Sequence, residues 1–369
     1  MTTTATAAVL VEPGRPLEIG QIELDEPRTG EVLVRVEAAG VCHSDYHYLN
    51  GDLRCPLPAV LGHEGAGVVE GVGPGVAHVA PGDAVSLLWR PRCGECRPCL
   101  SGHSERCVLG RVEAASGGLL DGTSRLSFKG APAYHFLGVS CFAERCVVPE
   151  RSVVPIPDGI PFAVAAIAGC AVITGVGAVL NTLGDVTGRG VAVFGAGGVG
   201  CSAVMAAATA GAFPVIAVDK SEQALALATA LGATHTVLAD GDTDAAIRRV
   251  CPDGTDAAVE AVGRPETMRA AFSALRPGGT LVAVGLAALG ENFSLPTNEL
   301  VQQEKRVVGS LYGSASPPLE LPRVFSLYRS SRMPLERLLG ATHSLSAVNE
   351  AYAELLAGAP GRAVIVPGS

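Results

Sequence analysis

The chain has 369 residues, of which 48% are hydrophobic and 17% are charged, a profile typical of globular rather than disordered proteins. This length is enough for two domains of ordinary size. The formal net charge of −9 and the lack of a Lys/Arg block argue against a nucleic-acid partner.

The number of cysteines and the N-terminal residues indicate the cellular compartment of the protein. Residues 1–8 have no basic region ahead of their apolar part, so they do not resemble a signal peptide. Eleven cysteines without such a signal favour metal binding over disulfides and a reducing compartment, which we expect to be the cytoplasm.

Short strands broken by Gly and Pro predict an antiparallel, barrel-like β domain from residue 5 to about residue 90. The segment Glu31–Glu37 alternates apolar and polar side chains, and shorter apolar runs follow at 67–70 and 83–88.

Two polar motifs in this region carry candidate metal ligands. The first reads Val-Cys-His-Ser-Asp-Tyr-His over residues 41–47, and the second reads Gly-His-Glu-Gly-Ala-Gly over residues 62–67. A lone histidine is usually a structural residue. Beside Glu64, and with a cysteine motif upstream, His63 becomes a candidate ligand.

Four cysteines follow, separated by two gaps of two residues and one gap of seven: Cys93, Cys96, Cys99 and Cys107. Four thiolates at this spacing can close a tetrahedral shell around one zinc ion, which leaves no position for water or substrate. The alternative is a set of free thiols or disulfides. The zinc interpretation predicts a structural site that shapes a lobe, and it directs attention to an open metal site elsewhere.

Residues 161–180 carry no charge and are long enough to cross a bilayer. They consist mainly of Ala, Gly, Val and Ile, with Cys170 and Thr174 among them. This composition predicts a buried helix with close backbone packing, so we expect no membrane partner.

From about residue 172, strands alternate with helices, which predicts an α/β fold with a doubly wound parallel sheet of the Rossmann type. The expected strands are 191–194, 214–219, 257–260 and 280–285. The expected helices are an Ala-rich helix after the first strand, 222–231 and 266–274. The chain returns to mixed structure after residue 311 and ends in a strand at 362–366.

These two patterns of predicted strands and helices divide the chain into two predicted domains. A nucleotide-binding domain at 172–311 interrupts a mostly β catalytic domain formed by 1–171 and 312–369. The cleft between the domains is the expected active site.

A glycine motif follows the first strand of the parallel sheet: Gly195, Gly197, Gly198, Val199 and Gly200. Its first glycine allows a tight turn, its second lets the backbone approach a pyrophosphate, and its last lets helix and strand pack closely. Asp219 ends the next strand, where it would bind the ribose hydroxyls and repel a 2′-phosphate. We therefore expect NAD rather than NADP, although Lys220 weakens that exclusion and a glycine-rich turn without ligand is the alternative.

Gly62-His63-Glu64, followed by Gly67, Gly73 and Val76, resembles the signature of the zinc-dependent alcohol dehydrogenases of the medium-chain dehydrogenase/reductase superfamily. The four cysteines and the dinucleotide motif lie where that family has them, and the resemblance covers essentially the whole chain. It implies a GroES-like catalytic domain and hydride transfer between NAD and a primary or secondary alcohol, or the matching aldehyde or ketone.

The resemblance also implies a second, catalytic zinc ion held by Cys42, His63 and Cys170. Three protein ligands leave a fourth position for an alcohol oxygen, whose hydroxyl pKa zinc lowers. Glu64 would lie just behind the metal. Asp45 would orient His63 through the ring nitrogen that does not bind zinc.

The resemblance implies further roles around the cofactor. Ser44 would take the hydroxyl proton, and His47 would pass it through the ribose to solvent, unless His47 is simply a surface histidine. His43 and Arg362 would contact the pyrophosphate, unless they are simple surface cations. Thr174 would lie among the cofactor-binding residues.

The small-molecule substrate is expected to meet an apolar pocket. By resemblance, Leu53, Trp89, Phe136 and Leu137 line it together with Ser44, and the Trp89 indole would restrict bulk next to the reacting carbon. The alternative for Trp89 is an ordinary core position.

The long loop between Cys107 and Phe136 resembles that of the dimeric animal-type enzymes and of thiol-dependent formaldehyde dehydrogenases, so we expect a homodimer. Two reactions compete: alcohol oxidation, and oxidation of a formaldehyde adduct of glutathione or mycothiol. Arg111 falls where glutathione-dependent enzymes hold a substrate carboxylate, but Leu53–Pro56 departs from their acidic segment. A non-catalytic nucleotide-binding relative is a third alternative.

Overall fold

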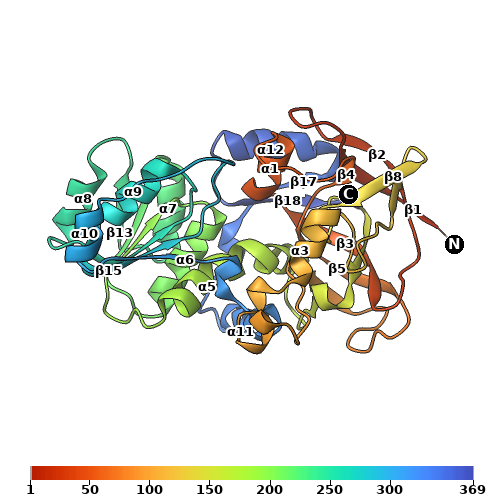
Figure 1. The fold of residues 1–369 in the computed structure, drawn as a ribbon, viewed down its shortest axis with the longest axis horizontal. Coiled ribbons are helices and arrows are strands. Elements are labelled where there is room, and N and C mark those ends of the chain that lie inside the picture. The colour runs from red at the N-terminus through yellow and green to blue at the C-terminus, as the bar shows by residue number, and fades with distance from the viewer. Residues whose placement is uncertain (1, 369) are drawn as a thin grey trace.

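The structure is a computed structural model that describes residues 2–368. Two lobes lie along its long axis (Figure 1). One lobe is rich in β-strands and holds both ends of the described chain, and the other is built on a parallel sheet.

The β-rich lobe contains a small closed barrel and a seven-stranded sheet. The barrel consists of β1 (Thr3–Leu10), β2 (Glu18–Leu24), β7 (Leu126–Phe128), β8 (Ala131–His135) and β4 (Ala59–Val60). The sheet consists of β10 (Val153–Pro155), β6 (Ala84–Leu87), β5 (Glu64–Val72), β3 (Glu31–Gly40), β18 (Arg362–Val366) and β17 (Leu339–Ser344), with β9 (Arg145–Pro149) also paired to β3. The expected barrel-like β domain is confirmed.

Strand β3 is the centre of this lobe. Val32, Val34 and Val36 alternate with more exposed residues and point into the core, as the period of two requires. The C-terminal strand β18 pairs with the far end of β3, and Val41 N–H donates to Ala363 O at 2.9 Å. The last strand is thereby brought beside the segment that follows β3.

The second lobe is a six-stranded, all-parallel sheet in the order β13-β12-β11-β14-β15-β16. Its strands are β11 (Val191–Phe194), β12 (Val215–Asp219), β13 (His235–Leu238), β14 (Thr255–Glu260), β15 (Leu275–Ala283) and β16 (Arg306–Gly309). The chain reverses direction across the sheet between β11 and β14, and ligands of such sheets bind at the carboxyl ends of the strands there. The expected doubly wound sheet is confirmed.

Helices cover both faces of this sheet. In β11, Val191 and Val193 face the core shared with helices α6 (Gly198–Thr209) and α7 (Glu222–Ala230). The intervening Ala192 and Phe194 face the core shared with α8 (Thr243–Val250) and α9 (Pro265–Ser273). A continuous apolar strand is what burial on both faces predicts.

A long helical segment at 162–183 joins the two lobes. It comprises α4 (Phe162–Ile167) and α5 (Ile173–Gly177), with π-type turns at Ala168–Val172 and Ala178–Leu183. Among the described residues it is the one helix long and apolar enough to span a membrane, and 89% of its most apolar window is buried inside the protein. The expected buried helix is confirmed, while the domain boundary drawn within it at 171/172 stays a prediction.

The remaining helices lie around the β-rich lobe and the sheet edge. They are α1 (His43–Leu49), α2 (Arg97–Leu100), α3 (Leu109–Ser116), α10 (Thr297–Gln302), α11 (Pro317–Arg329) and α12 (Val348–Leu356).

A buried ion pair anchors the long loop ahead of β7 to β3. Arg125 is 1% exposed and donates to both oxygens of Glu31, at 2.5 and 2.9 Å, and to Asp121 at 2.7 Å. Burial by itself raises the pKa of Asp121, but the Thr123 N–H and the Arg125 guanidinium outweigh it and lower the pKa to about 2. Because this folded-state pKa is depressed, the Asp121 contribution is present above about pH 4 and is lost as the pH falls through about 2.

Replacing Glu31 with Ala should lower the free energy of unfolding by about 3 kcal/mol. This is the low end for breaking a buried pair, because Asp121 remains beside Arg125. The matched control Glu70→Ala removes an exposed pair with Arg145 and should cost less than about 1 kcal/mol. Urea unfolding of both variants checks this, and equal losses would contradict a buried anchor.

Candidate active site

Four ionisable side chains from distant parts of the chain meet in the interior. One ligand atom from each of Cys42, His63, Glu64 and Cys170 lies within 4.8 Å of the others, and all four residues are buried. The Cys170 Sγ is 3.3 Å from the His63 Nε2. The three residues assigned to a catalytic zinc by resemblance are therefore brought together, with Glu64 beside them.

The orientation of His63 is fixed from behind. Its Nδ1 lies 2.9 Å from Asp45 Oδ1, which leaves Nε2 facing the cysteines. Gly62 donates its N–H to the same carboxylate oxygen. Gly62 has φ +90°, and a Cβ there would lie 2.6 Å from the Phe142 nitrogen, so only glycine fits this turn. The expected role of Asp45 matches this contact.

Cys170 reaches the cluster from a π-type turn, a distortion common at functional sites. A Cβ on the preceding Gly169 would lie 2.5 Å from the Leu87 carbonyl, so the helix packs directly on β6. The Tyr312 hydroxyl donates to the Gly169 carbonyl. Sequence reasoning missed Tyr312, which lies 143 residues from Gly169 along the chain.

Arg362 supplies a buried positive charge at the cluster. Its Nη2 donates to Glu64 Oε1 at 2.6 Å and to Cys42 Sγ at 3.3 Å. Contact with the Cys170 thiol, together with the charges of Arg362 and His63, holds the pKa of Cys42 well below its usual value. This shift favours the thiolate, the form that binds metal. Arg362 is no surface cation, since it is 4% exposed.

The chemistry of the donors fits zinc. Burial alone lowers the pKa of His63, but the charges of Asp45 and Cys42 outweigh it and raise the pKa well above its usual value, so the imidazole would release a proton on binding a metal. Burial also raises the pKa of Glu64 to about 7. The cluster combines two thiols with an imidazole, and a Cys2His set is a known catalytic zinc set. Glu64 already pairs with Arg362, which places it behind the other three.

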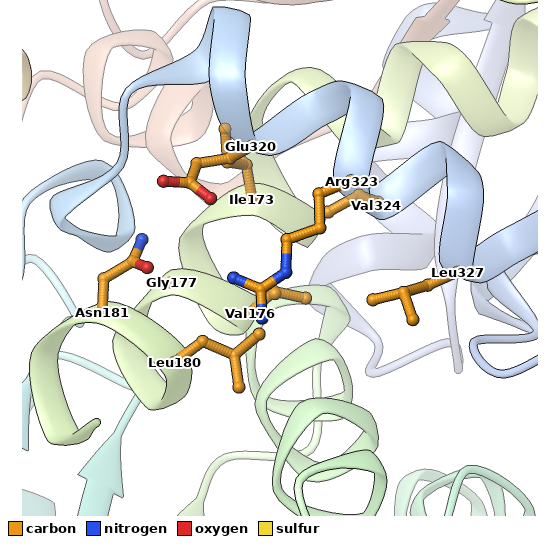
Figure 2. A pocket seen from close by; sticks show the side chains of 9 residues that line it. All are labelled: Ile173, Val176, Gly177, Leu180, Asn181, Glu320, Arg323, Val324 and Leu327. Atoms are coloured by element: carbon orange, nitrogen blue, oxygen red, sulfur yellow. The ribbon is translucent and has the colours of Figure 1, made fainter. Parts of the chain in front are cut away.

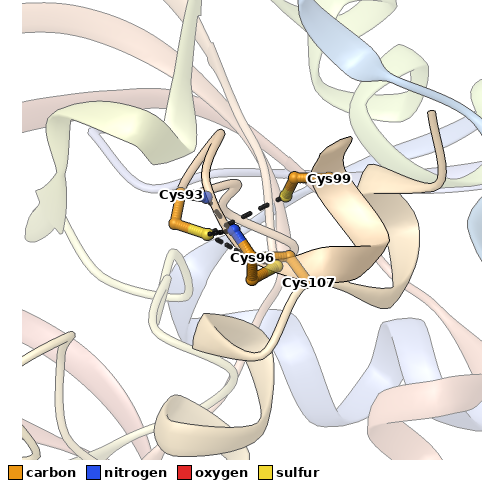
Figure 3. A group of neighbouring side chains, drawn as sticks. All are labelled: Cys93, Cys96, Cys99 and Cys107. Atoms are coloured by element: carbon orange, nitrogen blue, oxygen red, sulfur yellow. Dashed lines mark hydrogen bonds between the residues drawn. The ribbon is translucent and has the colours of Figure 1, made fainter. Parts of the chain in front are cut away.

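Four further cysteines, those of the motif at 93–107, form a second cluster near the surface of the β-rich lobe (Figure 3). Figure 3 shows their side chains converging on one point. The sulfur–sulfur distances are 3.6 Å for Cys93–Cys107, and 3.9 Å for both Cys93–Cys99 and Cys96–Cys107. A tetrahedron with zinc–sulfur distances of about 2.3 Å has edges of about 3.8 Å. The structure shows no disulfide among the four, and the sulfur–sulfur distances fit the zinc interpretation rather than unrelated free thiols.

The glycine motif has the geometry of a dinucleotide loop. Gly195 directly follows β11 and has φ +92°, and a Cβ on Gly200 would lie 1.7 Å from the Gly195 carbonyl oxygen, so strand and helix pack without a side chain. A Cβ on Gly197 would meet nothing within 4 Å, which leaves open space above the loop. Gly198 and Val199 begin α6, whose N-terminus faces that space.

Asp219 lies beside this loop at the end of β12. Its two oxygens accept the backbone N–H groups of Ala196, at 2.7 Å, and Ser221, at 2.9 Å. Lys220 is exposed next to it. Thr174 is buried in α5, which packs on α6 so closely that a Cβ on Gly175 would lie 2.2 Å from the Val199 carbonyl.

Three further predicted residues lie on α1. Ser44 is half-buried, and its N–H is 3.4 Å from the Cys42 sulfur at the start of the helix. His47 is also half-buried, and its Nδ1 is 2.9 Å from Asp52 Oδ2. His43 is exposed at the first position of the helix. Sequence reasoning missed Asp52, although its spacing of five residues from His47 was a usable signal.

Aromatic rings surround the imidazole. Trp89 and Phe136 both meet the His63 ring edge to face, with centroids 6.1 and 5.8 Å away. Leu137, next to Phe136 in the chain, and Leu53 are half-buried, while Arg111 is exposed on α3. Trp89 is thus placed beside the metal cluster.

A separate crevice between α5 and α11 is not a substrate site (Figure 2). It encloses about 10 Å³ and is lined mainly by apolar side chains such as Val176 and Val324. That volume holds at most one water molecule.

Two family models match the chain. Residues 28–158 match the alcohol dehydrogenase GroES-like domain, and residues 198–330 match the zinc-binding dehydrogenase domain. The chain is 39% identical over 368 residues to the NDMA-dependent alcohol dehydrogenase of Amycolatopsis methanolica, which covers 98% of both chains.

This chain belongs to the zinc-binding alcohol dehydrogenases of the medium-chain dehydrogenase/reductase superfamily.

Two more relatives are named for different reactions. The chain is 40% identical over 366 residues to the S-(hydroxymethyl)glutathione dehydrogenase of Escherichia coli O1:K1 / APEC, with 97% of this chain and 98% of the relative covered. The crystal structure of benzyl alcohol dehydrogenase from Acinetobacter calcoaceticus superposes with a TM-score of 0.93 at 32% identity, with 99% of each chain covered. The chain is accordingly a zinc-dependent alcohol dehydrogenase, and an enzyme rather than a non-catalytic relative.

Replacing Cys99 with Ala should reduce the zinc content from two ions per chain to one. Loss of a few kcal/mol of metal-linked stability should lower Tm on the order of 5–10 °C. Turnover measured well below that Tm should change little, because this cluster has no open ligand position. Elemental analysis, thermal unfolding and steady-state rates check this.

The matched control is Cys251→Ala, a half-buried cysteine outside both clusters, which should keep two zinc ions and the parent Tm. A Cys99→Ala variant that lost activity with an unchanged Tm would contradict a purely structural role.

Proposed function

We propose that the enzyme transfers a hydride between the carbinol carbon of a primary or secondary alcohol and NAD, with zinc held by Cys42, His63 and Cys170. One observation carries this proposal. Arg362 donates to Glu64 and Cys42 in the metal cluster, while a Cβ on Gly198 would lie 3.3 Å from its Nε. A single guanidinium therefore joins the metal cluster to the nucleotide loop.

The residues of this chain divide the remaining work. Zinc, when bound, acts as a Lewis acid on the substrate oxygen and lowers the pKa of its hydroxyl group. In this proposal Ser44 accepts the hydroxyl proton and His47 passes it to solvent, with Asp52 holding the His47 ring. Trp89 and Phe136 cover the imidazole and keep water from the reacting carbon.

The nucleotide loop supports a dinucleotide with its pyrophosphate above Gly197. The Nε of Arg362 is buried without a hydrogen-bond partner among the described residues, and it is available to a phosphate oxygen. His43, at the exposed start of α1, is assigned the same pyrophosphate and Thr174 the neighbouring part of the cofactor. Asp219 favours NAD because its charge repels a 2′-phosphate.

Replacing Asp219 with Asn should reduce the preference for NAD over NADP by roughly tenfold. The substitution removes the charge while keeping the shape, and one charge-assisted hydrogen bond is worth about 1.4 kcal/mol or more. Steady-state kcat/KM values with both cofactors check this. The control Lys220→Ala should strengthen the preference slightly, and an unchanged ratio in Asp219→Asn would refute the assigned role.

The pocket supports an apolar, aromatic alcohol as the substrate, because rings of Trp89 and Phe136 stand against the imidazole. The second candidate, a formaldehyde–thiol adduct, is favoured by Arg111, which is exposed on α3 and so could meet a charged substrate group. A benzyl alcohol dehydrogenase and an S-(hydroxymethyl)glutathione dehydrogenase among the relatives represent the two chemistries.

Rates with benzyl alcohol and ethanol should exceed those with formaldehyde plus glutathione or mycothiol by at least tenfold. Arg111→Ala should leave the alcohol rates unchanged, whereas Cys42→Ser should abolish turnover with every substrate because a ligand is lost. A thiol-dependent rate that dominates and collapses in Arg111→Ala would instead establish the second candidate. Full turnover of Cys42→Ser would refute the zinc mechanism.

We also propose a cytoplasmic homodimer. The edge strand β16 pairs only with β15 among the described strands. Leu289 and Val301, which precede β16 in the chain, are 71% and 68% exposed. An edge of this kind is suited to pairing with a second copy. Eleven free cysteines support a reducing compartment. Sedimentation should show a dimer, and a tetramer would reject this assembly.

A further inference from the structure

Tyr352 on α12 carries a buried hydroxyl group with no partner. The residue is 3% exposed, and its phenolic oxygen has no hydrogen bond within the described part of the chain. Burial and the nearby Asp45 carboxylate raise the pKa of Tyr352 well above its usual value, so the phenol stays protonated and can donate. Buried hydroxyl groups are almost always hydrogen-bonded, and this one requires an acceptor.

Asp45, in turn, has a buried acceptor oxygen that lacks a donor within the described chain. Its Oδ1 accepts from His63 Nδ1 and from the Gly62 N–H, at 2.9 and 3.2 Å. Its Oδ2 is buried and accepts nothing among the described residues. A buried carboxylate oxygen without a donor is costly, and a carboxylate can accept at both oxygens.

The packing brings these two groups into one neighbourhood. The Tyr352 ring lies 6.3 Å, centroid to centroid, from Tyr46, the residue after Asp45, and 6.3 Å from Phe142. Phe142 in turn lies against Gly62, which donates to Asp45. Tyr352 therefore packs beside the chain neighbour of Asp45 and beside Phe142, which lies against the glycine that donates to Asp45.

We propose that Tyr352 is a positioning residue that donates, through one buried water molecule, to Asp45 Oδ2 and so completes a chain from α12 to His63. A water with a hydroxyl and a carboxylate as partners is of the kind that proteins keep buried. The chain fixes the rotation of the carboxylate, and the carboxylate fixes the imidazole whose Nε2 faces Cys170. This inference rests on the proposed role of His63 as a catalytic zinc ligand.

Tyr352→Phe tests the proposal in the metal-loaded enzyme. Groups that support a ligating histidine typically change metal affinity 10–100-fold, so we expect the catalytic metal to leave about tenfold faster. The readout is release to a chelator from enzyme with cobalt at the catalytic site, followed by loss of its thiolate-to-cobalt absorption. The matched control Tyr46→Phe removes a hydroxyl from the same aromatic stack and should release metal at the parent rate.

Tyr352→Phe with an unchanged release rate and an unchanged cobalt spectrum would overturn the proposal. A high-resolution crystal structure of the parent enzyme gives an independent measurement. A water between the Tyr352 hydroxyl and Asp45 Oδ2 supports the chain, and a hydroxyl that faces only carbon atoms overturns it. If the parent enzyme held no metal at His63, the proposed function would fail instead.

Discussion

A cluster of buried ionisable groups is the constraint on which this structure depends. Cys42, His63, Glu64 and Cys170 are all buried, and burying such a set is unfavourable unless its charges are paired. The surrounding fold supplies the rest: Asp45 behind the imidazole, and Arg362 beside the carboxyl group and the thiolate. Metal binding and folding of this region are therefore coupled.

The residues of this cluster come from several separate elements of the fold. Its ligands come from the start of β5, the turn before α1 and the helix at 162–183, which continues into the packing against α6. Arg362 reaches the cluster because β18 pairs with the end of β3. The nucleotide loop and the metal cluster thus share a guanidinium and a helix.

Much of the fold follows from the sequence. The strands Val191–Phe194 and Arg362–Val366 have the expected bounds, because short apolar runs buried on both sides leave little choice of register. The strand His235–Leu238 and the helix Thr243–Val250 were missed, since the strand lies at a half-exposed edge and the helix is mostly polar. Strand β15 begins at Leu275, before the turn-like Pro-Gly-Gly that suggested a later start.

The site was predictable only in part. The spacing of the four surface cysteines is enough to group them, and the glycine motif can be recognised from its pattern. Cys170 lies 107 residues from His63, so its place at the metal rested on family resemblance. The contacts of Arg362 with Glu64, of Tyr312 with Gly169 and of Tyr352 near Asp45 depend on tertiary packing that no local pattern encodes.

The central claim is that this chain holds two zinc ions in different environments. Anomalous diffraction from crystals at the zinc absorption edge tests it directly. We predict two peaks per chain: one about 2.0–2.3 Å from the ligand atoms of Cys42, His63 and Cys170, and one about 2.3 Å from the four sulfurs of the surface cluster. A single peak at the surface cluster, with none at His63, would contradict the account.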